Sequence, residues 1–349
     1  MGEEAIENNK EQRVFLIFSF LIIFLVALIS GVYWFTAKDR SAYQGPMEKV
    51  SISLSSTSFL PALVHVANHN KYFLDEGLDV EIVGYSAGRF AFQAMLDGEV
   101  DIATVSDPNV VSQSFKRDDF KVFSTIVDSA NHAKALARVD SGIQTPNDLI
   151  GKRIATTKGT TASYFLISFF IFHGLDINKV EVVDLKPGEM VDALVTKNVD
   201  AIFTWEPNIL KAQEKLGKSA ILLPSEVGYK ATFSLAAKDS FVKDNPELLK
   251  RLLQSLIKAE EYMREYRKES IEILSSATGA KKQHVDMLFD NYLFRLSLSQ
   301  SLISSLENQA RWEISNNDSY QGSHMPNYLD YFVLDILNKV KPESVTIIQ

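Results

Sequence analysis

The sequence of 349 residues contains no cysteine and has no surplus of basic residues. Without cysteine, the chain has no disulfides, no thiolate metal sites, no cysteine nucleophile and no lipid-modified cysteine. Its formal net charge of -8 argues against a nucleic-acid partner, because binding phosphates requires a basic surplus. The composition, 46% hydrophobic and 23% charged, is that of a globular protein with ample material for a core.

Sequence motifs for catalysis and metal binding are missing as well. There is no Walker loop, no Gly-x-Ser-x-Gly elbow and no dinucleotide-binding glycine pattern. His65 and His69 have the spacing of zinc-binding helices, but no glutamate stands between them and no third ligand is evident. We therefore predict no catalytic residue, no metal and no cofactor.

A long apolar run does occur, at residues 14–35, with a short tail (1–13) before it and a linker (36–47) after it. The run is uncharged and close to the roughly 20 residues that cross a bilayer. A cleaved signal peptide is the alternative, but its apolar stretch is usually about 7–15 residues long. We predict an uncleaved transmembrane anchor. Lysine and arginine lie on both sides of the run, so charge alone barely indicates its orientation.

From residue 49 onward, strand-like and helix-like patterns alternate. Strand-like runs cover 49–55, 79–85, 101–106 and 121–127, and helical patterns lie at 60–73 and 88–99. This alternation predicts an α/β protein with a mostly parallel sheet.

The pattern then recurs. Residues 94–108 align without a gap on 193–207, and each segment ends in an acidic residue followed by proline. Although any two β-α-β units look similar, the matched order of features favours a structural repeat and hence two similar lobes. We expect lobe 1 at 48–143, lobe 2 at 144–228, and a return to lobe 1 with C-terminal helices over 229–349. Two crossings between lobes would form a hinge beside a cleft.

The C-terminal part is predicted to be mainly helical after a last strand at 231–238. A long helix is expected over 245–266, where Asn245 caps and Pro246 occupies the first turn. Further helices are expected at 281–294, 300–314 and 328–340.

Candidate ligand-binding residues follow from the rule that open α/β sheets bind ligands beyond the carboxyl ends of their strands. Hydroxyl, amide, aromatic and acidic side chains stand at these places in both halves of the chain. The candidates are Ser56, Thr57, Ser106, Asp107, Asn131, Gly159, Thr160, Thr161, Ser163, Trp205 and Glu206. Such a set suits a small polar ligand.

The segment around Lys158 and Gly159 is the strongest of these candidates. A strand at 152–157 leads into the turn, and an apolar helix, which we expect to be buried, begins at Thr160 or Thr161. The free amides of a helix start attract a carboxylate, sulfonate, phosphate or nitrate. The alternative is that the threonines only cap the helix.

Trp205 and Glu206 leave two interpretations open. Together they suit a ligand with an amino group or a heterocycle, through cation–π contact and a carboxylate. In the other interpretation Trp205 is core and Glu206 caps the next helix. Asp107 is the counterpart in the first half of the repeat.

Taken together, these segments resemble the solute-binding proteins of ABC importers for sulfonates, taurine, nitrate and thiamine-pyrimidine precursors. The resemblance spans about 50–337 and is carried by the segments KYFLDEGLDVEIV (71–83), QAMLDGEVDIATV (93–105), DLIGKRIATTKGTTASY (147–164) and DALVTKNVDAIFTWEP (192–207).

The resemblance implies a periplasmic-binding-protein fold of type II, with two Rossmann-like lobes that close over the ligand like a Venus flytrap. It implies a permease and an ATPase as partners. It also implies anion cradling by Gly159, Thr160, Thr161 and Ser163, with further contacts from Trp205, Glu206, Ser56 and Thr57. With the anchor at 14–35, we expect a single-pass protein of the cytoplasmic membrane, its binding domain on the periplasmic or extracellular side.

Two other functions stay open at this point. One is an enzyme on the same fold acting on a small pyrimidine-like or carboxylate substrate, although the iron-linked synthases similar to this family need a cysteine-rich motif. The other is a ligand sensor that acts through a membrane partner.

Overall fold

The computed structural model describes residues 43–56 and 58–348. The predicted anchor at 14–35 and Thr57 lie outside these ranges. Within them, no helix is long and apolar enough to cross a membrane. The sheets and helices belong to one compact unit that begins at Pro46.

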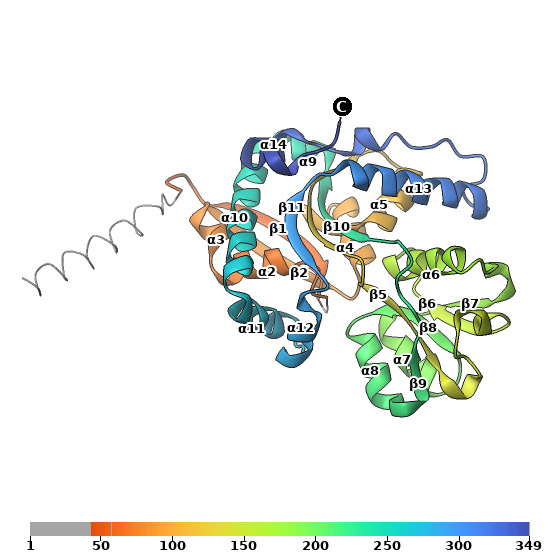
Figure 1. Cartoon of the computed structure of the whole chain (residues 1–349). Coiled ribbons are helices and arrows are strands. Elements are labelled where there is room, and N and C mark those ends of the chain that lie inside the picture. The colour runs from red at the N-terminus through yellow and green to blue at the C-terminus, as the bar shows by residue number, and fades with distance from the viewer. Residues whose placement is uncertain (1–42, 57, 349) are drawn as a thin grey trace, which may run out of the picture. The chain divides into compact units, whose positions relative to one another are not determined.

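Two sheets form the cores of two lobes (Figure 1). The first sheet has the order β11-β4-β10-β3-β1-β2 and the second β7-β6-β8-β5-β9. The strands of the first sheet are β1 (Glu48–Ser55), β2 (Leu78–Tyr85), β3 (Ile102–Ser106), β4 (Phe120–Ser129), β10 (Ala231–Lys238) and β11 (Leu293–Ser297). Those of the second sheet are β5 (Ala133–Arg138), β6 (Arg153–Thr156), β7 (Glu181–Asp184), β8 (Ala201–Trp205) and β9 (Ala220–Leu222).

Helices accompany each sheet. Lobe 1 has α2 (Ala62–His69), α3 (Tyr72–Asp75), α4 (Gly88–Asp97), α5 (Asp107–Ser114), α9 (Asp239–Asp244), α10 (Pro246–Glu265), α11 (Arg267–Thr278), α12 (Lys282–Phe289), α13 (Gln300–Asn316) and α14 (Asp335–Val340). Lobe 2 has α6 (Thr161–Phe172), α7 (Pro187–Val195) and α8 (Asn208–Leu216). Figure 1 shows the two groups around their own sheets.

The predicted repeat agrees with the strand order. In lobe 1, β2-β1-β3 run parallel and the returning strand β10 is antiparallel to β3. In lobe 2, β7-β6-β8 run parallel and the crossing strand β5 is antiparallel to β8. Most strands of each sheet share one direction, as predicted, but β10 and β5, which arrive from the other lobe, run the opposite way. In the first sheet β11 is also antiparallel to β4.

The first crossing differs from the predicted boundary between 143 and 144. β4 belongs to the first sheet and β5 to the second, so the chain crosses over residues 130–132. Segment 133–138 pairs with β8 and β9, which places it in lobe 2. The second crossing lies between β9 and β10.

Two C-terminal predictions need correction. The helix expected at 281–294 ends at Phe289, because Leu293 and Phe294 pair with β4 as part of β11. The helix expected at 328–340 is a 3-10 turn, Tyr328–Tyr331, followed by the short helix α14.

α6 shows one buried face rather than complete burial. Phe165, Leu166, Phe169 and Phe170 are at most 2% exposed and form the core of lobe 2 with β8 and β5. Near its C-terminal end, Ile171 and Phe172 are instead about 60% exposed, at 62% and 61%. The expectation that the whole helix is buried was therefore wrong.

Candidate functional site

A cavity of about 30 Å³ lies between the two lobes. Its lining comes from both: Ser55, Ser58, Leu60, Pro61, Gly88, Arg89, Thr104, Ser106, Asn109, His132, Thr160, Thr161, Trp205 and Phe233. One buried water needs about 10–15 Å³, so this volume admits only a few waters or one compact group. Residues of both lobes line the cavity and hydrogen bonds join the lobes beside it, and we refer to this arrangement as closed.

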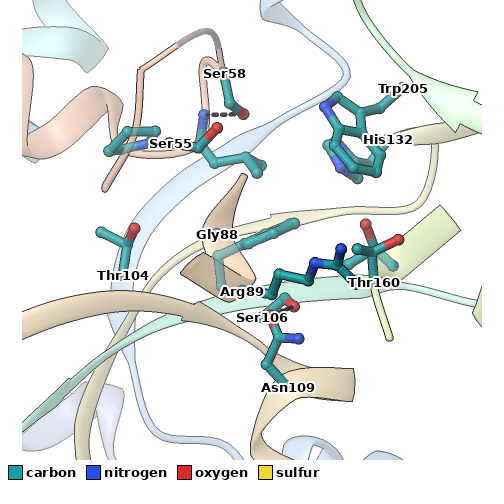
Figure 2. Close-up of a pocket in the computed structure, with 14 residues that line it drawn as sticks. Ser55, Ser58, Gly88, Arg89, Thr104, Ser106, Asn109, His132, Thr160 and Trp205 are labelled. Atoms are coloured by element: carbon teal, nitrogen blue, oxygen red, sulfur yellow. Dashed lines mark hydrogen bonds between the residues drawn. The ribbon is translucent and has the colours of Figure 1, made fainter. Parts of the chain in front are cut away.

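Among the described residues of this lining, Arg89 is the one whose side chain is charged at neutral pH. It lies in the first turn of α4, and Figure 2 shows its guanidinium reaching toward Thr160 in the other lobe. Its Nη1 donates to the carbonyl oxygen of Lys158 at 3.0 Å. Its Nε is buried without a hydrogen-bond partner among the described residues, and the guanidinium lies over the Phe90 ring at 4.7 Å from the ring centroid; no ion pair joins it to a carboxylate of the described chain. A partly buried, unpaired cation is costly unless an anion meets it.

The start of α6 faces Arg89 across the cavity. Thr160 is the N-cap residue and forms a capping box, in which its backbone N–H donates to Oγ of Ser163 at 3.1 Å. The Thr160 hydroxyl donates to the carbonyl oxygen of Thr157 at 2.7 Å. Thr161 also lines the cavity, and its hydroxyl takes no part in the capping box, which joins Thr160 and Ser163. The threonine that caps the helix also lines the cavity, so its capping role is compatible with anion binding, which stays a prediction.

Two stacked rings form another wall. The imidazole of His132 lies over the indole of Trp205, with ring centroids 5.8 Å apart and an angle of 18° between the planes (Figure 2). Phe233 meets His132 edge-on at 5.1 Å. Burial, and then the nearby Lys134 ammonium, lower the pKa of His132 to about 3. The imidazole is therefore neutral at physiological pH, and it covers one face of the indole.

Asn109 connects the lobes directly beneath the cavity. Its Nδ2 donates to the carbonyl oxygen of Gly159 at 2.6 Å, and its Oδ1 accepts from the Ser106 hydroxyl at 2.8 Å. Ser106 thus orients the asparagine that reaches across to the loop before α6.

The two acidic candidates do not line the cavity. Asp107 is 2% exposed and accepts hydrogen bonds from the Tyr229 hydroxyl, the Thr232 backbone N–H and the Gln309 amide. Burial raises the pKa of Asp107 to about 7, while these three donors act in the opposite direction.

Glu206 is likewise engaged elsewhere. Its Oε2 accepts from the backbone N–H of Leu210 at 3.0 Å, and its Oε1 lies 3.5 Å from the Lys134 ammonium. The interpretation of Glu206 as a helix cap is therefore the one that fits, and a direct contact with a ligand amino group does not.

Four more candidates lie away from the cavity. Ser56 is exposed and donates to the Tyr85 carbonyl, whereas its neighbours Ser55 and Ser58 line the cavity. Asn131 bonds to Asn291 at 3.1 Å. Gly159 and Ser163 line a separate groove of about 670 Å³ behind the loop. The structure thus brings Ser106, Thr160, Thr161 and Trp205 together and leaves the other described candidates outside.

Arg89, Asn109 and His132 were missed by reasoning from the sequence. Arg89 follows β2 by a few residues, so the rule about carboxyl ends would have found it had the end of that strand been considered. His132 lies in the first crossing, which was placed too far along the chain. Asn109 likewise follows the end of β3 by three residues, although its contact with Gly159 depends on how the two lobes meet.

These features define a class: the chain has the two-lobed α/β fold of the periplasmic binding proteins. The structure of the periplasmic aliphatic sulphonate binding protein SsuA from Escherichia coli is similar with a TM-score of 0.67 and 18% identity, covering 77% of this chain and 87% of that one. The alkanesulfonate-binding protein SsuA from Xanthomonas axonopodis pv. citri, bound to MOPS, is similar with a TM-score of 0.70 and 18% identity, covering 83% and 100%.

The family follows from the sequence comparison. The profile of the NMT1/THI5 like family matches residues 59–270, and the chain belongs to that family. A protein of Bacillus subtilis (strain 168) named for binding aliphatic sulfonates is 26% identical over 77% of this chain and 82% of its own length. The taurine-binding periplasmic protein of Escherichia coli (strain K12) is 28% identical over 63% and 68%.

These relatives are binding proteins. The desulfurization enzyme DSZB matches in fold, at 15% identity and a TM-score of 0.61. The comparisons thus support a binding protein rather than an enzyme, as the sequence predicted.

Proposed function

We propose that this protein is the solute-binding component of an ABC import system and that it holds a small organic anion in the cavity between its lobes. The single observation that carries the proposal is Arg89, a cation in the cleft whose Nε is buried without a partner. A partly buried guanidinium is stabilised by a charged partner, and a bound anion would supply one.

The ligand's anionic group would be held from both lobes. Arg89 from lobe 1 and the first turn of α6, with Thr160 and Thr161, from lobe 2 offer charge-assisted and backbone hydrogen bonds. The organic part would lie against Trp205 and Phe233. Relatives named for sulfonates and taurine favour a sulfonate as the anionic group.

Transport would follow from hinge closure. The two crossing segments would let the lobes open, and contacts of the ligand with both lobes would favour the closed state. The type II assignment is supported by the strand order β2-β1-β3-β10-β4. Permease and ATPase subunits would receive the ligand.

The apolar run at 14–35 would hold the protein at the cytoplasmic membrane, with its lobes on the periplasmic or extracellular side. Its length and lack of charge are the support for this part of the proposal. If carbonate washing released the full-length chain from isolated membranes, the anchor would be disproved.

The main test is ligand binding by the full-length chain in detergent. A thermal-shift screen with alkylsulfonates, nitrate, carboxylates and pyrimidines should give an increase in melting temperature with sulfonates. Arg89→Met should then weaken the affinity at least ten-fold, because a hydrogen bond between charged groups contributes about 1.5–3 kcal/mol and about 1.4 kcal/mol is ten-fold.

The exposed Arg264 provides the matched control, since Arg264→Met makes the same change on the outer face of α10. That variant should bind like the parent. If no anion binds the parent, or if both arginine variants bind equally well, the cavity is not the ligand site.

A further inference from the structure

The charge of the cavity is unusual for a site that would hold a zwitterion. Its lining contains Arg89 and the neutral His132, and none of the described residues that line it carries a carboxylate. An ammonium group placed there would meet a like charge from Arg89 and would lose its hydration without gaining a counter-ion.

The two carboxylates nearest in sequence to the lining cannot supply that counter-ion in the closed state. Asp107 is held by Tyr229, Thr232 and Gln309, none of which lines the cavity. Glu206 is held by the start of α8 and by the Lys134 ammonium.

The aromatic wall offers an ammonium group little in return. A cation–π contact needs an open ring face, and His132 covers one face of the Trp205 indole at a centroid distance of 5.8 Å. His132 itself contacts the Phe233 ring at 5.1 Å and the Tyr292 ring at 6.1 Å, so this aromatic cluster occupies the His132 side of the indole.

Resting on the proposed function, we infer that the cavity selects compact monoanions and discriminates against ligands that also carry an ammonium group. A short alkylsulfonate binds, and the aminosulfonate taurine is rejected, although a taurine-binding protein is among the relatives of this chain. Arg89 and the absence of a carboxylate in the lining are the determinants of this specificity.

The experiment compares two ligands of nearly equal size with the full-length chain in detergent, by isothermal titration calorimetry at pH 7. 2-Hydroxyethanesulfonate carries a hydroxyl where taurine carries an ammonium, so the pair isolates the charge. The hydroxyl compound should bind at least ten-fold more tightly than taurine. Ethanesulfonate should also bind more tightly than taurine.

A variant pair tests the determinant directly. Ser55 lines the cavity and is 7% exposed, so Ser55→Asp introduces the missing carboxylate. In this variant, the ratio of the affinity for 2-hydroxyethanesulfonate to the affinity for taurine should be at least ten-fold lower than in the parent. The uncharged Ser55→Asn variant should leave the ratio unchanged.

The outcomes separate this inference from the proposed function. If taurine bound as tightly as 2-hydroxyethanesulfonate, or if both bound equally weakly while ethanesulfonate bound well, selection by charge would be wrong and the sulfonate carrier would stand. If ethanesulfonate and every other small anion failed to bind, the proposed function would fall, and this inference with it. If the Ser55→Asp variant does not fold, the affinities of the parent for taurine, 2-hydroxyethanesulfonate and ethanesulfonate are sufficient to test the inference.

Discussion

Asp107 shows how a buried carboxyl can serve the fold rather than the ligand. It accepts hydrogen bonds from three segments: Tyr229 after the second crossing, Thr232 in β10 and Gln309 in α13. The Gln309 Oε1 is buried without a partner. A half-turn of that amide would let a protonated Asp107 donate to it, at the 2.5 Å separation that now joins the two side chains. The raised pKa of Asp107 fits such a neutral carboxyl.

The pKa of Asp107, raised from 3.8 to about 7, has a consequence for stability. Between these values the folded state holds a proton that the unfolded state has released. The free energy of unfolding therefore falls as pH rises through this window, by at most about 1.4 kcal/mol per pH unit from this group. The asparagine side chain of the Asp107→Asn variant cannot ionise. In urea titrations, the free energy of unfolding of this variant should therefore decline less between pH 5 and pH 8 than that of the parent.

The exposed Asp79 gives the control for this measurement, because Asp79→Asn removes a carboxylate that lies on the outer edge of lobe 1. Its pH dependence should follow the parent. Identical slopes for the parent and Asp107→Asn would show that the buried carboxyl is not the group that titrates.

In the first turn of α6, we expect one hydroxyl to contribute to stability and another to ligand binding. Ser163 completes the capping box and faces the groove behind the loop, whereas Thr161 faces the cavity. Ser163→Ala should lower the free energy of unfolding by about 1 kcal/mol, as the loss of a helix cap does, and leave the sulfonate affinity nearly unchanged.

Thr161→Val is the reciprocal variant, because it preserves side-chain shape and removes only the hydroxyl. It should weaken sulfonate binding several-fold and change stability little. Urea unfolding and calorimetry on both variants provide the check. If Ser163→Ala were the variant that lost affinity, the assignment of the two hydroxyls to cap and cavity would be reversed.

Much of the element order could be predicted from the sequence, because alternation and capping are local patterns. The strands at 49–55, 79–85, 101–106 and 231–238 recur within a residue or two as β1, β2, β3 and β10. β5 and β11 could not be predicted in the same way. Segment 133–138 carries Lys134 and Arg138, and β11 follows a helical pattern, so only pairing with β8 and β4 makes them strands.

The candidate site was predictable only where the rule of strand ends applies. That rule found Ser106, Thr160, Thr161 and Trp205, which line the cavity. It also selected Asp107 and Glu206, whose partners come from packing that no local pattern reveals. In Asp107 the decisive donor is Gln309, far along the chain in α13.

The two lobes are held in their closed arrangement by a small number of polar contacts. Arg89 donates to Lys158 at 3.0 Å and Asn109 donates to Gly159 at 2.6 Å, both across the cavity. Farther out, the His284 Nε2 lies 3.8 Å from Glu214 of α8. A hydrogen bond such as the first two contributes only about 1 kcal/mol, so we expect the ligand-free chain to populate both open and closed states.

The absence of cysteine makes this balance measurable, since spin labels can be attached at two introduced cysteines alone. Lys218→Cys on lobe 2 and Lys268→Cys on α11 of lobe 1 are exposed positions suited to pulsed electron resonance. The ligand-free chain should give a broad distance distribution, and saturating ethanesulfonate should shift it to a single shorter distance. Unchanged distances on binding would mean that the lobes do not close over the ligand.

Asn109→Ala then tests what the contacts across the cavity contribute. Because the variant removes the bond to Gly159, the short-distance population should shrink and the sulfonate affinity should fall about five-fold, which corresponds to about 1 kcal/mol. Asn338→Ala removes an exposed asparagine on α14 and should leave both unchanged. A loss of affinity in Asn109→Ala with an unaltered distance distribution would mean that Asn109 acts on the ligand itself, and the closing of the lobes would then depend on Arg89 and the anion.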